Sequence, residues 1–232
     1  MKRLLTISAL FCTLFVQAQI KATSAQERLK SIDQRKQLLS RSTLNETGFR
    51  NIGPSIMSGR VVDIEVNPQD PTEFYVAYAS GGLWQTKNNG QSFTSIFDSV
   101  DVLTIGDIAV NWQNRHIWVG TGEGNPRNSI NIGEGVYKTM DAGRTWKRMG
   151  LEQTKNIHRV IIDPNNPNTV YAGAIGNPYG QSKDRGVYKT NDGGETWNQI
   201  LFTNDTTGPG DMIMDPTNPN KLLVAMWHHY RK

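Results

Sequence analysis

Charged side chains recur at one position of a repeated unit in this 232-residue chain. When the chain is aligned on its apolar segments, Asp63, Asp107, Arg159 and Asp211 occupy equivalent positions, and Arg60 lies three residues before the first of them. Carboxylates and guanidinia gathered at one place can line a ligand pocket, where their pKa values shift. They can also pair as ions between neighbouring units, and we favour this second arrangement.

Two long polar segments supply further groups that could bind a ligand. They span Thr121–Gly133 and Ala174–Arg185, and both contain Gly-Asn-Pro. Their amide, guanidinium and aromatic groups suit sugar hydroxyls or a peptide backbone, because planar polar groups give direction and an aromatic face gives area. The alternative is that they are solvated loops without a ligand. The ligand-binding candidates from these segments, the repeated charged position and the C-terminal residues are Arg60, Glu123, Asn125, Arg127, Arg159, Tyr179, Arg185 and Trp227.

An eight-residue pattern, Ser/Thr-x-Asp/Asn-x-Gly-x-Ser/Thr-Trp/Phe, occurs three times. The copies begin at Thr86, Thr139 and Thr190, at intervals of 53 and 51 residues. The Asp or Asn can accept backbone N–H groups of its own turn, and the Gly can adopt φ > 0. A carboxylate committed to backbone donors has a lowered pKa and is a poor proton donor. We therefore expect a structural role for Asn88, Gly90, Phe93, Asp141, Gly143, Trp146, Asp192, Gly194 and Trp197.

Short apolar segments surround each copy of the pattern in the same order. Four short antiparallel strands per repeat of about 50 residues predict an all-β propeller. We expect three complete blades at about 59–97, 105–149 and 156–202, and half of a fourth at about 208–230. Because a closed ring has about four to eight blades, this predicts the N-terminal part of a longer protein, or a truncated and poorly soluble product. Strand alternation places the long loops on the face opposite the pattern hairpins.

The N-terminus predicts export from the cytoplasm. A basic Met1–Arg3 precedes an apolar Leu4–Val16 segment that is too short to span a membrane, so 1–18 is expected to be a signal peptide cleaved after Ala18. The remaining chain has no cysteine, because Cys12 lies in this leader. Residues 19–48 form a polar lead-in with one short helix. A secreted, periplasmic or cell-surface location follows.

Several partners and cofactors are not expected. The formal charge of +4 includes Lys2 and Arg3 of the leader, and the other basic residues are scattered, which argues against a nucleic acid or a membrane surface. His228 and His229 are adjacent and would point to opposite faces of a strand, so no metal site is expected. The glycines of Gly120–Gly124 lack the Lys-Ser/Thr of a phosphate loop, so no cofactor is expected.

The three pattern copies and their strand units resemble the Asp-box, or BNR-repeat, β-propellers. Over about residues 49–230 the chain is similar to bacterial secreted proteins related to the sortilin (VPS10) propeller and to xyloglucan-acting glycoside hydrolases. The segment Phe49–Pro54, followed by Ser58, Gly59 and Arg60, looks like the opening motif of that bacterial group. The same pattern also occurs in sialidases, so it indicates fold more than activity.

The resemblance to xyloglucanases implies a catalytic Asp just before the paired glycines of a Tyr-Ala-Arg-Thr-Asp-x-Gly-Gly stretch. This chain has Ala79 at that place. A methyl group cannot act as acid or base, and glycoside hydrolysis needs two carboxyl groups, the second of which the resemblance places in a later propeller. For sialidases, Arg50 matches the arginine of Phe-Arg-Ile-Pro, but Asn51 interrupts the motif.

Two functions therefore stay open. The first is a secreted, non-catalytic module that recognises a glycan or an extracellular protein or peptide through the long loops. The second is a glycoside hydrolase fragment whose catalytic carboxylates lie outside the chain or are relocated onto Asp107, Glu123 or Asp184.

Overall fold

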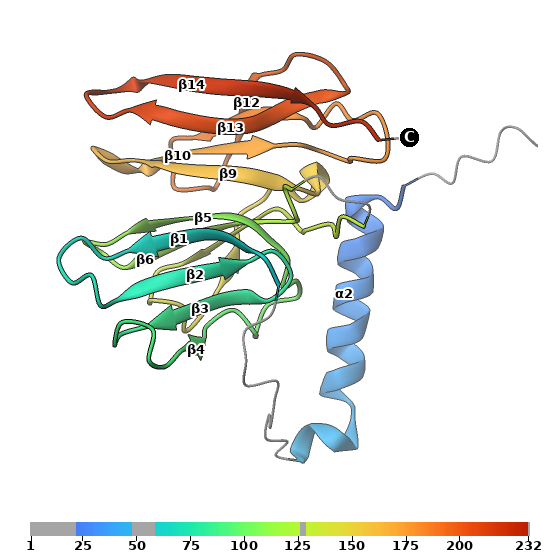
Figure 1. Ribbon diagram of the computed structural model, residues 1–232. Coiled ribbons are helices and arrows are strands. Elements are labelled where there is room, and N and C mark those ends of the chain that lie inside the picture. Colours follow the sequence, from blue (N-terminus) through green and yellow to red (C-terminus); the bar gives the residue numbers. More distant parts are fainter. Residues whose placement is uncertain (1–21, 48–58, 126–128, 232) are drawn as a thin grey trace, which may run out of the picture. The chain divides into compact units, whose positions relative to one another are not determined.

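The computed structural model describes residues 22–47, 59–125 and 129–231 (Figure 1). The predicted signal peptide, the Phe49–Pro54 motif, Ser58 and Arg127 lie outside the described residues. The chain divides into two units, Met1–Glu46 and Thr47–Lys232. Each unit is described below by itself.

The described part of the first unit, residues 22–46, contains the α-helix α2 (Ala25–Ser40) and a short 3-10 turn, η1 (Thr43–Glu46). The helix begins with a capping box, because the Glu27 backbone N–H donates to the Ser24 hydroxyl and the Ser24 N–H donates to the Glu27 carboxylate. No helix residue is buried. The short polar helix expected from the sequence is thus present.

The second unit consists of antiparallel sheets whose strands follow one another in chain order, as Figure 1 shows. We call each sheet a blade. Blade 1 contains β1 (Val61–Val66), β2 (Phe74–Tyr78), β3 (Gly82–Thr86) and β4 (Thr94–Ser95). Blade 2 contains β5 (Ile105–Asn111), β6 (His116–Thr121), β7 (Val136–Thr139) and β8 (Lys147–Arg148).

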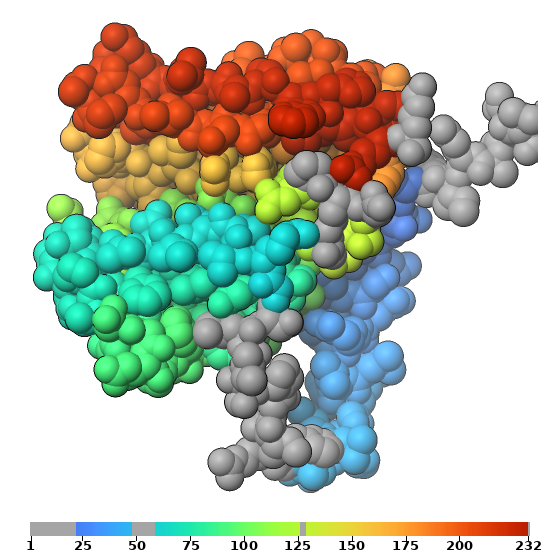
Figure 2. Space-filling view, viewed as in Figure 1, coloured from blue at the N-terminus to red at the C-terminus, as the bar shows by residue number. Residues whose placement is uncertain are grey.

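Blade 3 is preceded by a 3-10 turn, η2 (Glu152–Thr154), and contains β9 (Ile157–Asp163), β10 (Asn166–Ala174), β11 (Gly186–Thr190) and β12 (Asn198–Leu201). The half blade contains only β13 (Thr207–Asp215) and β14 (Asn218–His228). In Figure 2 this red and orange pair forms a layer above the yellow strands of blade 3. Three complete blades and half of a fourth confirm the predicted all-β propeller architecture.

The eight-residue patterns form the β3–β4, β7–β8 and β11–β12 hairpins. In blade 2, one Asp141 carboxylate oxygen accepts the Thr145 N–H at 2.9 Å, and the other accepts the Thr145 hydroxyl at 2.7 Å. These bonds lower the pKa of Asp141 to about 2. Asp192 makes the same bonds with Thr196, and its pKa is also lowered. The carboxylates of these two patterns are therefore turn-forming acceptors.

The tryptophan that ends each of the last two patterns reaches back to the preceding blade. The Trp146 indole N–H donates to the Ile96 carbonyl at 2.7 Å, and the Trp197 indole N–H donates to the Met149 carbonyl at 2.6 Å. The Trp197 ring meets Trp118 edge to face at a centroid distance of 6.3 Å. Each pattern thus shapes its own hairpin and also fixes it to the neighbouring sheet.

Replacing Trp197 with Phe is expected to destabilise the contact between blades 2 and 3. The Met149 carbonyl loses its donor while most of the ring contact stays, which should lower the free energy of unfolding by about 2 kcal/mol. The measurement is the urea midpoint followed by far-UV circular dichroism. A Trp227→Phe variant is the control, because that side chain is exposed. Equal midpoints for both variants would contradict a stabilising indole–carbonyl bond.

Candidate functional site

A β-bulge precedes the charged residue on each of the four inner strands, β1, β5, β9 and β13. The register of each strand with its partner shifts one step before Asp63, Asp107, Arg159 and Asp211. A bulge re-aims the side chain next to it and increases the local twist. The equivalence of these four positions, expected from the sequence, therefore has a shared backbone feature behind it.

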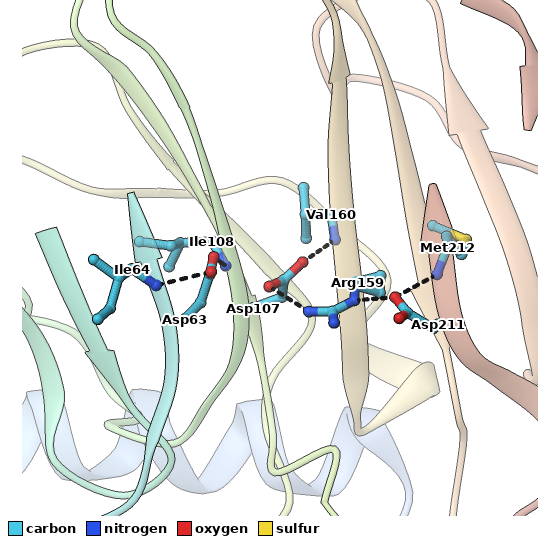
Figure 3. Close-up of polar contacts among 8 residues, drawn as sticks. All are labelled: Asp63, Ile64, Asp107, Ile108, Arg159, Val160, Asp211 and Met212. Atoms are coloured by element: carbon cyan, nitrogen blue, oxygen red, sulfur yellow. Dashed lines mark hydrogen bonds and ion pairs between the residues drawn. The ribbon is translucent and has the colours of Figure 1, made fainter. Parts of the chain in front are cut away.

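The four charged side chains form a row that crosses the blades (Figure 3). Asp63 accepts the N–H of Ile108 in blade 2 at 3.4 Å, and Asp107 accepts the N–H of Val160 in blade 3 at 2.7 Å. Arg159 replaces the carboxylate at the third position. The ion pairs of Arg159 join neighbouring blades in the way the sequence favoured, whereas Asp63 joins them through a backbone N–H.

Arg159 lies between two carboxylates of the row. Its Nη1 is 3.1 Å from Asp107, and its Nε is 2.6 Å from Asp211 of the half blade. The hydrogen bond from Arg159 is the largest influence on Asp211 and lowers its pKa. Burial raises the pKa of Asp107 well above its ordinary value, and the nearby charge of Asp63 adds to this effect. The contacts of Asp107 with the Val160 N–H and the Arg159 guanidinium oppose this rise in its pKa.

A cavity of about 180 Å³ lies where the loops of blades 2 and 3 meet the end of β14. Trp227 lines it and is 62% exposed, while Tyr179, which follows the lining residue Pro178, is 47% exposed. The Tyr179 hydroxyl accepts the Ile130 N–H at 2.8 Å and so joins the two loops. The cavity is lined by Gly124, Ile130, Ile175, Pro178, Trp227, His228, His229 and Arg231.

Glu123 supports the blade 2 loop from inside. Its side chain is fully buried, accepts the Asn131 N–H at 2.9 Å and lies 3.4 Å from the Arg60 guanidinium. The Asn156 amide donates to the carbonyls of Glu123 and Asn131. Gly124 then passes directly over His158, because a Cβ at Gly124 would lie 1.8 Å from the His158 Nδ1. These contacts hold the cavity wall in place.

Arg185 supports the blade 3 loop in a similar way. Its fully buried guanidinium donates to the carbonyls of Ile175, Asn177, Gly180 and Asp205. Burial lowers its pKa to about 10. The sequence suggested a ligand-binding role for Arg185, but the structure uses its donors to shape the loop, so we do not place it in the site.

The remaining candidate residues lie in different parts of the structure. Trp227 lines the cavity, and Tyr179 follows the lining residue Pro178 and bonds to Ile130. Asp107 and Arg159 lie in the charged row, and Asp184 is half-buried in the blade 3 loop, where burial raises its pKa. Asn125 is half-buried at the edge of the described blade 2 loop, and Arg127 is not described. The candidate carboxylates thus fall into separate surroundings.

Two buried histidines, His158 and His229, lie near the cavity, and the sequence did not indicate that they would be close to it. Burial lowers the pKa of His229 to about 4, and its Nε2 lies 3.3 Å from the Pro209 carbonyl. Burial also lowers the pKa of His158, the bulge residue before Arg159. In the sequence, His158 could have been noticed because it directly precedes Arg159, which occupies the repeated charged position. Among the described residues, no group of three or more His, Cys, Asp or Glu side chains could hold a metal ion.

No helix in residues 22–47, 59–125 and 129–231 is long and apolar enough to cross a membrane.

Comparison with known proteins supports the propeller fold. No family model matches the chain. A probable oligoxyloglucan-reducing end-specific xyloglucanase of Neosartorya fischeri is 25% identical over 146 residues, which cover 59% of this chain and 16% of that protein. The chain therefore spans about one sixth of this relative.

Two solved structures give the same indication. The GH74 enzyme of Niastella koreensis matches with a TM-score of 0.53 and 23% identity, over 72% of this chain and 26% of that one. The GH74 xyloglucanase of Xanthomonas campestris matches with a TM-score of 0.55 and 16% identity, over 69% of this chain and 26% of that one. The chain is thus a β-propeller similar to those of glycoside hydrolases, and it spans about a quarter of their length.

Replacing Glu65 with Gln is expected to change how stability depends on pH. Glu65 follows Asp63 on β1, and burial, together with the Asp63 charge, raises its pKa from 4.5 to about 7. The folded state therefore binds the proton more tightly than the unfolded state, and stability falls as pH rises from about 4.5 through 7. Removing this effect should stabilise the protein by about 2–3 kcal/mol above pH 7 and little below pH 4.5.

Urea unfolding at pH 4.5, 6 and 8 measures the effect of Glu65→Gln, with Glu46→Gln as a control at an exposed residue of the first unit. A difference from the unchanged protein that is constant across this range would contradict the raised pKa.

Replacing Arg185 with Lys is expected to loosen the blade 3 loop while the sheets remain. An ammonium group cannot reach four carbonyls in the planar geometry of a guanidinium. Backbone N–H groups between residues 177 and 182 should exchange with deuterium about tenfold faster. Arg144→Lys, at an exposed hairpin position, is the matched control and should leave this exchange unchanged. Unaltered exchange in Arg185→Lys would show that the loop does not depend on the guanidinium.

Proposed function

We propose that the loop face of this propeller binds a glycan. One observation carries the proposal: the partly exposed aromatic rings of Tyr179 and Trp227 belong to two elements that meet at one small cavity. Aromatic faces pack against the apolar faces of sugar rings, and neighbouring polar groups orient the hydroxyls. Here His228 and Arg231 supply those polar groups at the cavity wall.

The surroundings of the candidate carboxylates favour binding over hydrolysis. A glycosidase needs two carboxyl groups that reach opposite sides of the scissile bond. Asp107 is buried and bonded to Val160 and Arg159, and Glu123 is fully buried beneath its loop. Asp184 is half-buried in a different loop. These contacts suit structural roles for the first two groups and leave Asp184 without a matching carboxylate at the cavity.

The environment of Ala79 points in the same direction. This residue stands where the resemblance to xyloglucanases implies a catalytic Asp. Its side chain is buried, its N–H donates to the Arg60 carbonyl at 2.9 Å, and its carbonyl accepts the Ile105 N–H at 3.2 Å. The backbone therefore continues the sheet contacts through this position, and the side chain offers no acid or base.

The ligand class follows from the relatives and from the predicted leader. A xyloglucanase relative and propellers of GH74 enzymes support a plant-type β-glucan, such as a xyloglucan oligosaccharide, as the first ligand to test. The predicted signal peptide supports a location outside the cytoplasm, where such polysaccharides are met. The Asp-box and sortilin-like resemblance supports a role in recognition.

A glycoside hydrolase is the second candidate function. The curated relative is a probable xyloglucanase, and Asp107 has the raised pKa that suits a general acid. In this case the second carboxylate would come from residues outside those described. The similarity to these enzymes is the observation in favour of a hydrolase. The residues that line the loop cavity include no pair of carboxylates.

Replacing Trp227 with Ala is expected to weaken the binding of xyloglucan oligosaccharides at least tenfold, because the largest exposed ring of the cavity is removed. Isothermal titration calorimetry measures the affinity. The matched control is Leu223→Ala, which removes a still more exposed apolar side chain from the same strand but does not line the cavity. Its affinity should equal that of the unchanged protein.

Undiminished binding by the Trp227→Ala variant would contradict a glycan site at this cavity. Release of reducing sugar that is lost in an Asp107→Asn variant would favour the hydrolase instead. Both assays use the same oligosaccharides, so the two candidate functions are compared on one substrate.

A further inference from the structure

A second and larger cavity lies between blades 2 and 3 at the opposite ends of their strands. Its volume is about 440 Å³, and the β7–β8 and β11–β12 hairpins form its sides. Because consecutive connections of an antiparallel sheet lie at opposite strand ends, this cavity is on the face away from the loops of the proposed glycan site. It is lined by Lys138, Met140, Asp141, Thr145, Trp146, Lys147, Met149, Asn168, Asp192, Gly193 and Glu195.

The acidic groups of this cavity already have partners. Asp141 and Asp192 accept hydrogen bonds within their own hairpins, as described above. Glu195 of blade 3 pairs with Lys147 of blade 2 at 2.8 Å, and both side chains are largely exposed. An exposed pair of this kind contributes little and can open to admit a ligand.

The Lys138 ammonium group can donate further hydrogen bonds to a ligand. Its half-buried ammonium group lies 4.5 Å above the Trp118 ring and donates to the Gly193 carbonyl at 3.3 Å. An ammonium group has three donors, so this hydrogen bond leaves two directed elsewhere. Burial lowers the pKa of Lys138, the charge of Glu195 opposes this effect, and the charge of Lys147 adds to it. An anionic ligand that reached this group would therefore offset the cost of burying its charge.

The other side of the cavity is apolar and adaptable. Met140 is 65% exposed at the rim, and Met149 is buried below it. Unbranched thioether side chains adjust to apolar groups of different shape and are frequent on surfaces that bind peptides. The Trp146 indole N–H is committed to the Ile96 carbonyl, so this ring offers area and no further donor.

The propeller scaffold does not require a cation at this place. In each complete blade, one residue of the third strand pairs across the sheet with an aromatic residue of the second: Gln85 with Tyr75, Lys138 with Trp118, and Lys189 with Tyr171. Blade 1 has a neutral amide at this position, whose nitrogen donates to the Tyr75 hydroxyl at 3.3 Å. In blades 2 and 3 the lysine lies over the aromatic ring instead. The position therefore tolerates a change of charge, and in blade 2 Lys138 lines the cavity beside Met140 and Met149.

We infer that this cavity binds an extended peptide segment in which a carboxylate side chain lies beside an apolar one. The carboxylate pairs with the Lys138 ammonium group, and the apolar side chain packs against Met140 and Met149. The two methionine side chains adjust to aliphatic groups and so favour a peptide over an acidic sugar, although the Trp146 ring lines the same cavity. This site lies beyond the proposed glycan function and does not depend on it.

The test uses the unchanged protein and two probes. The first is an acetylated and amidated hexapeptide that alternates leucine and glutamate, and the second has glutamine in place of glutamate. With methionine methyl groups labelled with carbon-13, the first peptide should shift the Met140 and Met149 signals and leave Met212 of the half blade unchanged. The glutamine peptide should bind at least tenfold more weakly.

Lys138→Gln is the decisive variant, because blade 1 already carries Gln85 at the equivalent position and the sheet should form normally. It should bind the glutamate peptide at least tenfold more weakly. Lys189→Gln is the matched control, because it makes the same change at the equivalent position of blade 3, outside this cavity, and should bind as before.

Three results would overturn the inference. The first is equal affinity for the two peptides, and the second is full affinity in Lys138→Gln. The third is an oligogalacturonate that shifts the same methionine signals more strongly than the glutamate peptide, which would identify an acidic glycan as the ligand. These outcomes do not depend on whether the Trp227→Ala variant binds glycan, so the peptide site and the proposed glycan function are tested separately.

Discussion

The hydrogen-bonded row at the inner strands decides how neighbouring blades meet. The buried carboxylate of Asp107 accepts a backbone N–H of the next inner strand, and a bulge places it to do so. A buried carboxylate without such a donor would cost several kcal/mol, so the row tolerates only one spacing between adjacent strands. Arg159 keeps that spacing at the third position by bonding carboxylates on both sides. The indole contacts of Trp146 and Trp197 then close the same interfaces from the opposite strand ends.

Much of this scaffold could be predicted from the sequence because its cause is local. The eight-residue patterns place an acceptor, a positive-φ glycine and an aromatic residue at fixed offsets, so the hairpins around Asp141 and Asp192 followed directly. Aligning the apolar segments also gave the equivalence of Asp63, Asp107, Arg159 and Asp211. The bulges were not predictable, because an extra residue in a strand leaves no distinct mark in an apolar segment.

The candidate site was harder to predict because its residues meet only through tertiary contacts. Tyr179 and Trp227 were expected to bind a ligand; Trp227 lines the cavity, and Tyr179 is next to the lining residue Pro178. Arg185 and Glu123 were also expected to bind a ligand, yet they are buried and support the loops from below. Residue type alone cannot separate a side chain that faces a ligand from one that binds the carbonyls beneath it. That difference depends on how two loops from different blades fold over one another.

The cross-strand pairs of Gln85, Lys138 and Lys189 have a consequence for how such a propeller can change over time. Lys138 adds one hydrogen bond to the Gly193 carbonyl of the next blade, but the indole and carboxylate contacts that join the blades lie at other positions, so this position can vary in charge. A single substitution at this position can then give one gap between blades a charge that the other gaps lack. A repeat protein built in this way can gain new specificities one gap at a time, while a single scaffold is inherited unchanged.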